Sequence, residues 1–210
     1  MTSLIDLKGR KVALGGGKES TQGYFTELLL RTAGMTLDDL EIVNLNFADA
    51  LAALANKSVD AAFLPDPFKA QARQKGIAVS IARVGVPGRS GVTTLFGAKF
   101  IAQRPEAANA LMLALVRGAR DLQGSGVKLE DNLAAISKYT KIPIEALRTS
   151  DPYEYDPNLA PDVETILGMQ QLFLNNHQLG YAAPLPIERL IDGSFSRYAG
   201  EKLGGTGGKS

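Results

Sequence analysis

The stretch Lys11-Val12-Ala13-Leu14-Gly15-Gly16-Gly17-Lys18-Glu19-Ser20-Thr21 decides the fold. It joins a short apolar run to three glycines, a pattern typical of a buried strand that enters a tight turn. A helix is predicted next, because apolar side chains then recur three and four residues apart until Gly34. Such a strand–turn–helix unit favours an α/β fold.

The same unit repeats along the first part of the chain. Further strands are predicted over residues 40–45, 59–64 and 77–81, with a helix at 50–55 capped by Asn46 and another at 67–74. Successive β–α units of this length imply parallel pairing and right-handed crossovers. We therefore expect one complete α/β lobe over residues 8–86.

The second part of the chain has a different pattern. A glycine-rich segment at 84–91 is predicted to be a hinge, and Val92–Phe96 a single strand, before helices that begin near Pro105, Leu129, Pro143 and Pro161. The inward face of the first of these helices is predicted from its apolar spacing: Ala108, Leu111, Met112, Leu115, Ala119 and Leu122. We expect residues 87–200 to form the hinge, one strand and the helices of an incomplete, helix-rich second lobe, and residues 201–210 a flexible tail.

The composition excludes several classes of function. The chain has 210 residues, 45% hydrophobic and 21% charged, and its formal charge of +1 argues against a nucleic-acid binder. With no cysteine and one histidine, disulfides, thiolate metal sites and multi-histidine metal sites are excluded, and we predict no metal and no cofactor. The N-terminus lacks the apolar stretch of a secretory signal, so the protein is either cytoplasmic or numbered from a point after signal removal.

The glycine turn is the first candidate for chemistry. A helix N-terminus presents backbone N–H groups and a partial positive charge, and glycines allow close approach of an anion. Gly17, Ser20 and Thr21 are therefore candidate ligand-binding residues. The alternative is a tight turn in which Ser20 or Thr21 only caps the helix.

The same turn approximates the dinucleotide-binding fingerprint G-x-G-x-x-G. Ser20 stands in place of the third glycine, and the second strand ends in Asn44 and Asn46 rather than in the acid that would bind a ribose. The sequence therefore disfavours a dinucleotide-dependent oxidoreductase.

Asn46, Asp66 and Arg89 complete the candidate set. Asp66 follows a predicted parallel strand, where open α/β sheets place ligands, but it is equally placed to cap the helix that starts at Pro67. Arg89 lies beside the hinge glycines and is a candidate for the charged end of a ligand, the alternative being an ordinary solvated side chain.

Several segments, in this order and spacing, resemble one known family. They are Leu7–Ala13 with the glycine turn, Leu29–Met35, Asp38–Val43, Asp49–Leu54, Val59–Ala62, Asp66–Phe68, Phe100–Asp121, Lys138–Thr140 and Asp162–Gln171. The resemblance is to periplasmic substrate-binding proteins of ABC importers, closest to the nitrate, taurine and alkanesulfonate class. It implies two α/β lobes that close on a small anionic or zwitterionic ligand and deliver it to permease subunits, without covalent chemistry. Pocket residues in the family come from βα turns, which by position are Gly17, Ser20, Thr21, Asn46, Asp66 and Arg89.

The sequence departs from the family at its beginning. In the family an N-terminal stretch supplies most of the first lobe's sheet, and this chain starts after it. If that stretch is absent, we expect weak ligand binding and homo-oligomers that cover exposed helix faces. Other functions considered are an enzyme on the same fold, of the type that makes cofactor precursors, and a sensing module completed by another chain.

Overall fold

The protein is described by a computed structural model that covers residues 1–85, 89–150 and 156–204. The chain forms two compact units, Met1–Arg89 with Met169–Ala182, and Ser90–Gly168 with Ala183–Ser210. The predicted lobe boundary at residue 86 falls close to the first division, whereas the inclusion of residues 169–182 in the first unit was not predicted.

The elements of residues 1–85, with short 3-10 helices labelled η, are η1 (Ile5–Leu7), β1 (Lys11–Leu14), η2 (Gly17–Glu19), α1 (Thr21–Arg31), η3 (Leu37–Asp39), β2 (Glu41–Asn44), α2 (Phe47–Ala55), β3 (Ala61–Ala62) and α3 (Phe68–Gln74). The later elements are α4 (Ala98–Gln103), α5 (Pro105–Asp121), η4 (Gly124–Lys128), α6 (Glu130–Thr140), α7 (Ile144–Thr149), α8 (Val163–Asn175), η5 (Ile187–Arg189) and α9 (Ser194–Lys202). Helix α8 starts in the second unit and ends in the first.

The first unit is built on a parallel sheet in the order β2–β1–β3. Strand β1 is central, with Val12 opposite both Ile42 of β2 and Ala61 of β3. The predicted α/β fold with parallel strands is thereby confirmed.

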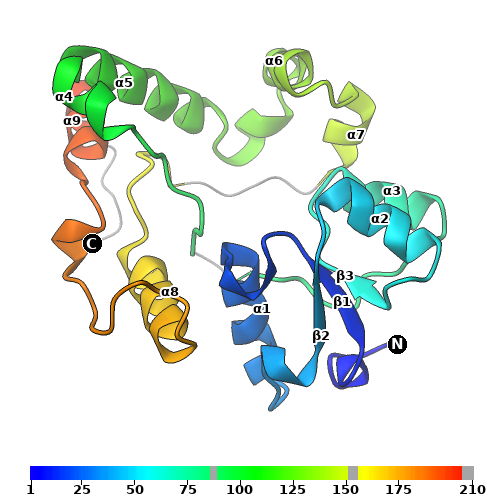
Figure 1. The fold of residues 1–210 in the computed structure, drawn as a ribbon. Coiled ribbons are helices and arrows are strands. Elements are labelled where there is room, and N and C mark those ends of the chain that lie inside the picture. Colours follow the sequence, from blue (N-terminus) through cyan, green and yellow to red (C-terminus); the bar gives the residue numbers. More distant parts are fainter. Residues whose placement is uncertain (86–88, 151–155, 205–210) are drawn as a thin grey trace. The chain divides into compact units, whose positions relative to one another are not determined.

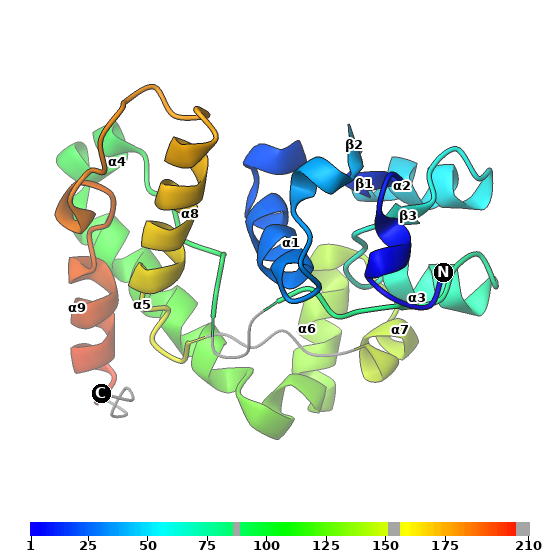
Figure 2. The ribbon, with the colours of Figure 1, turned by 90° about the horizontal axis from the view of Figure 1, so that it is seen from below.

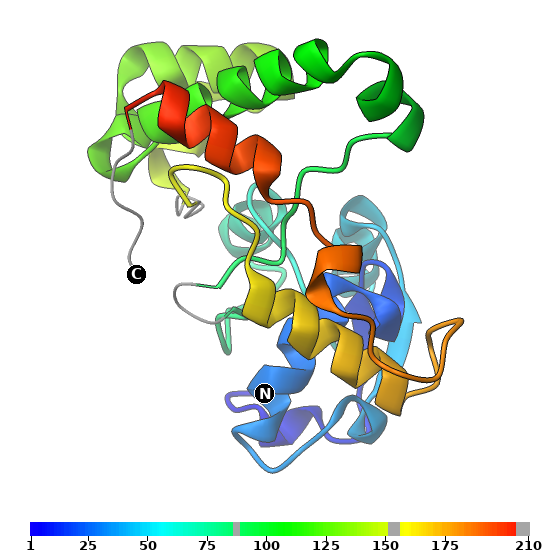
Figure 3. The same cartoon turned by 90° about the vertical axis from the view of Figure 1, so that its left-hand side faces the viewer.

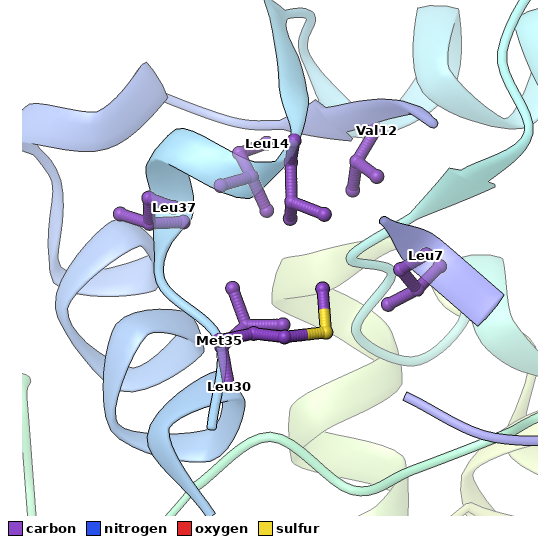
Figure 4. Close-up of a cluster of buried hydrophobic side chains, with 7 residues drawn as sticks. Leu7, Val12, Leu14, Leu30, Met35 and Leu37 are labelled. Atoms are coloured by element: carbon purple, nitrogen blue, oxygen red, sulfur yellow. The ribbon is translucent and has the colours of Figure 1, made fainter. Parts of the chain in front are cut away.

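Alternating side chains of β1 pack against different helices. Val12 and Leu14 point to one face, where they meet Leu30 of α1 together with Met35 and Leu37 (Figure 4). Ala13 points to the other face and packs against Ala50 and Ala53 of α2. Figures 1 and 2 show α1 on one side of the sheet and α2 with α3 on the other.

The predicted fourth strand at residues 77–81 is wrong. The N–H groups of Ile77 and Ala78 donate to the carbonyl of Ala72 and close the end of α3, with Gly76 in the left-handed region at φ 63°. Because these N–H groups are used by the helix terminus, they do not extend the sheet.

The second unit is helical in the part that the structure describes. Helix α9 runs along α5 (Figure 3), and Ala199 of α9 packs with Met112 and Val116 of α5. The predicted inward face of α5 is wrong in part, because α9 covers the stripe from Ala108 to Ala119 and leaves Leu111 44% and Leu115 38% exposed.

Two further expectations for this unit differ from the structure. Val92–Phe96 forms no strand, and Val92 instead makes a local hydrogen bond to the hydroxyl of Ser90. Helix α9, which was not predicted, continues to Lys202, so the expected tail at 201–210 begins within a helix and its last six residues lie outside the described part. Among the described residues no helix is long and apolar enough to span a membrane.

Candidate functional site

The turn between β1 and α1 is fixed by backbone conformation and one side chain. Gly16 and Gly17 have φ values of 82° and 70°, in the left-handed region that favours glycine. A Cβ atom on Gly16 would also lie 2.8 Å from the Cβ of Ser20. The hydroxyl of Ser20 accepts a hydrogen bond from the Gly23 N–H at 3.0 Å and donates to the Gly17 carbonyl at 2.8 Å. Ser20 is therefore the N-cap of α1, as one of the two interpretations of this residue predicted.

Two residues of α1 that were not predicted also hold this turn. Gln22 accepts a hydrogen bond from the Gly15 N–H at 3.0 Å through its Oε1. Gly23 allows the turn to fold back, because a Cβ at this position would collide with the carbonyl groups of Lys18 and Gly17. A glycine in the first turn of a helix, where it lowers helix propensity, is the sequence signal that could have identified Gly23.

The turn after β2 is hydrogen-bonded to the turn after β1. Asn44, the last residue of β2, accepts a hydrogen bond from the Gly16 N–H at 2.9 Å. Asn46 caps α2 by accepting from the Asp49 N–H at 2.9 Å, and its amide donates to the Asp49 carboxylate at 2.6 Å. The predicted cap at Asn46 is confirmed, while Asn44 joins the site as a residue that had been used only to argue against dinucleotide binding.

The turn after β3 lies beside the turn after β2. The rings of Phe47 and Phe68, the first residues of α2 and α3, lie 5.9 Å apart between centroids. Asp66 accepts a hydrogen bond from the Ala70 N–H at 3.2 Å and pairs with Lys69 at 3.2 Å, and its side chain is 10% exposed. Both interactions are those of a helix cap, so the capping role of Asp66 is confirmed.

The structure thus brings Gly17, Ser20, Thr21, Asn46 and Asp66 to the carboxyl edge of one parallel sheet, the edge at which open α/β sheets bind ligands. Arg89 is the last residue before the division between the units and follows residues 86–88, which lie outside the described part. Its place in the site stays a prediction.

The chemistry available at this edge is that of binding. The first N–H groups of α1 and α2 have no acceptor within their helices, so they can donate to an anion, and the helix dipole adds a partial positive charge. Lys18 does not add a free cation, because its ammonium pairs with Asp38 at 2.6 Å. In the described part of the chain no three His, Cys, Asp or Glu side chains are grouped to hold a metal ion.

A separate hollow of about 610 Å³ lies beside α3 and the segment after it, lined by Arg73 and residues 76–80. It is open to solvent, and Arg73 is its one charged lining residue. Because a binding site needs several converging polar groups, we assign the candidate site to the sheet edge instead.

A family and a curated relative match the sequence. Residues 1–124 match the family described as NMT1/THI5 like. A protein of Brucella abortus (strain 2308), whose name describes it as a binding protein, is 28% identical over 152 residues, which are 70% of this chain and 46% of the relative. The chain therefore spans about half the length of this relative.

Solved structures share the fold. The alkanesulfonate-binding protein SsuA from Xanthomonas axonopodis pv. citri, bound to MOPS, matches with a TM-score of 0.69 and 19% identity, over 87% of this chain and 63% of that one. The desulfurization enzyme DSZB matches with a TM-score of 0.58 and 16% identity, over 96% of this chain and 73% of that one. The fold is that of periplasmic-binding proteins, and the chain belongs to the NMT1/THI5-like family.

Proposed function

We propose that this chain is part of a solute-binding protein of an ABC-type importer and that it captures a small anionic or zwitterionic ligand. The observation that carries the proposal is the gathering of three βα turns at one sheet edge, linked by the Gly16–Asn44 hydrogen bond and the Phe47–Phe68 contact. The fold shared with an alkanesulfonate-binding protein supports a sulfonate, taurine or nitrate as the ligand.

The partners and location follow from the same proposal. The ligand would be delivered to permease subunits, and the protein would act outside the cytoplasmic membrane, without a cofactor. Association into homo-oligomers stays a prediction, which size-exclusion chromatography with light scattering tests directly.

Isothermal titration calorimetry with ethanesulfonate, taurine and nitrate tests the ligand class. Asn44→Asp keeps the oxygen that accepts from Gly16 but places a negative charge at the sheet edge. We expect it to weaken anion binding by about tenfold at low ionic strength, through like-charge repulsion. Asn56→Asp is the matched control, because Asn56 is also exposed and also accepts a backbone hydrogen bond, at the far end of α2. Failure of the unmodified protein to bind any of the three ligands would contradict the proposal.

A second candidate is an enzyme on this fold, supported by the match to DSZB. The sequence has no cysteine, so thiolate chemistry is not available to it. Incubation with biphenyl-2-sulfinic acid, the compound bound in a DSZB variant, followed by mass spectrometry, distinguishes the two. We expect no consumption of this compound, and turnover would favour the enzyme.

A further inference from the structure

Residues 90–96 of the second unit, here called the connector, are held without regular secondary structure. Between its ends Val92 is 74% and Leu95 is 88% exposed. At its far end Phe96 packs against Phe100 and Phe195, with ring centroids 5.9 and 5.4 Å away. Figure 1 shows the connector as a plain trace that leads into α4.

The near end of the connector is bound by Asp162. Asp162 Oδ2 accepts a hydrogen bond from the Ser90 N–H at 2.9 Å, across 72 positions of sequence. The same carboxylate accepts from the Thr165 N–H at 3.0 Å and from the Thr165 hydroxyl at 2.9 Å. Thr165 is 2% exposed, so this part of the arrangement is buried.

An ordinary helix cap would satisfy only the first turn of its own helix. Capping accounts for the bond from the Thr165 N–H, because α8 begins at Val163. It does not account for the bond from Ser90, which belongs to another segment. A carboxylate has two acceptor oxygens for these donors, whereas an asparagine has one oxygen and would have to give up at least one bond.

The positions of these residues in the chain give the arrangement its meaning. Ser90 is the first residue of the second unit, and α8 is the helix in which the chain leaves that unit, between Gly168 and Met169. We propose that Asp162 is a clasp that ties the point where the chain enters the second unit to the helix by which it leaves. The entry and the exit are then held as one body within this unit. This proposal needs no ligand and stands apart from the proposed function.

Hydrogen exchange measured by NMR on the ¹⁵N-labelled full chain tests the clasp. In Asp162→Asn we expect exchange of the Ser90 amide and of the first turn of α8 to rise by about tenfold, because a hydrogen bond to a charged group is lost. In Thr165→Val, which removes only the hydroxyl bond, we expect the Ser90 amide to change by less than about twofold. The amides of β1 serve as the internal reference.

The outcomes separate a clasp from a cap. If Asp162→Asn speeds exchange in α8 and leaves Ser90 unchanged, Asp162 is only a helix cap and the proposal is overturned. An equal rise at Ser90, in α8 and in β1 would reflect a global loss of stability and would also count against it.

Discussion

The two units of the molecule build their cores in different ways. In the first, a parallel sheet supplies a backbone framework, and the side chains of β1 alternate between two helical layers. In the second, the core around Met112, Val116 and Ala199 is made by helices alone in the described residues. Small side chains such as Ala108 and Ala199, each 0% exposed, let α5 and α9 approach closely.

This difference explains why the candidate site lies in the first unit. Parallel strands end at one edge, so residues as far apart in sequence as Gly16 and Asn44 become neighbours through the pairing of β1 with β2. Helices packed along their lengths do not gather their termini in this way. The helical unit instead leaves pairs of apolar side chains exposed, such as Leu111 with Leu115 and Val163 with Leu167.

Removal of one buried leucine from each core should have the largest effect. Leu14 is 1% and Leu133 is 2% exposed, so Leu14→Ala and Leu133→Ala delete the same groups from the first and second unit. We expect each to lower the free energy of unfolding of its own unit by about 3 kcal/mol, through lost burial and a cavity. Hydrogen exchange during urea titration reports the β1 and α5 amides separately. If either substitution shifts both sets of amides equally, the two units unfold as one.

A methyl group added at a glycine should distinguish the turn-built unit from the helical one. We expect Gly23→Ala to cost about 2 to 3 kcal/mol, because its Cβ meets the backbone carbonyls of Lys18 and Gly17. Gly118→Ala, in the exposed middle of α5 with no atom within 4 Å of the added Cβ, should instead stabilise by about 0.5 to 1 kcal/mol. Urea unfolding followed by circular dichroism measures both, and a harmless Gly23→Ala would show that the turn is not tightly constrained.

Local signals predicted most of the first unit. The apolar run of β1, the caps Ser20 and Asn46 and the start of α5 at Pro105 depend on neighbours in sequence, and the structure confirms each of them. For the same reason the helices were predicted more reliably than the strands, since a strand also needs a partner.

Features that depend on distant residues were not predictable. The stretches at 77–81 and 92–96 have the composition of strands, but their N–H groups bond locally, to Ala72 and to Ser90. The exposure of Leu111 depends on where α9 packs, and α9 has few apolar residues to mark it. In the site, Asn44 and Gln22 act through bonds to glycine N–H groups, which no residue pattern encodes.

Loss of a helix cap should have a moderate effect confined to the first unit. Ser20→Ala removes the acceptor for the Gly23 N–H, and we expect a loss of about 1 kcal/mol in the free energy of unfolding. Ser20→Asp keeps an acceptor and should be close to the unmodified protein. Chemical denaturation measures both variants, and equal losses would mean that the hydroxyl acts through its bond to the Gly17 carbonyl instead.

The smallest effect is expected from acid, and it should be similar in the two units. The pKa of Asp39 is lowered first by the hydrogen bond from the Thr36 N–H and then by Lys8, while the pKa of Asp192 is lowered by the hydroxyl and N–H groups of Ser194. A carboxyl group whose pKa is lower in the folded than in the unfolded protein stabilises the fold above its unfolded pKa of about 4. This contribution is lost as the pH falls through the folded pKa. The stability advantage of the unmodified protein over Asp39→Asn and over Asp192→Asn should therefore shrink between about pH 6 and pH 3. Urea titrations across this range measure it for β1 and α9 amides separately, and a constant difference would show that neither carboxylate is stabilised by its partners.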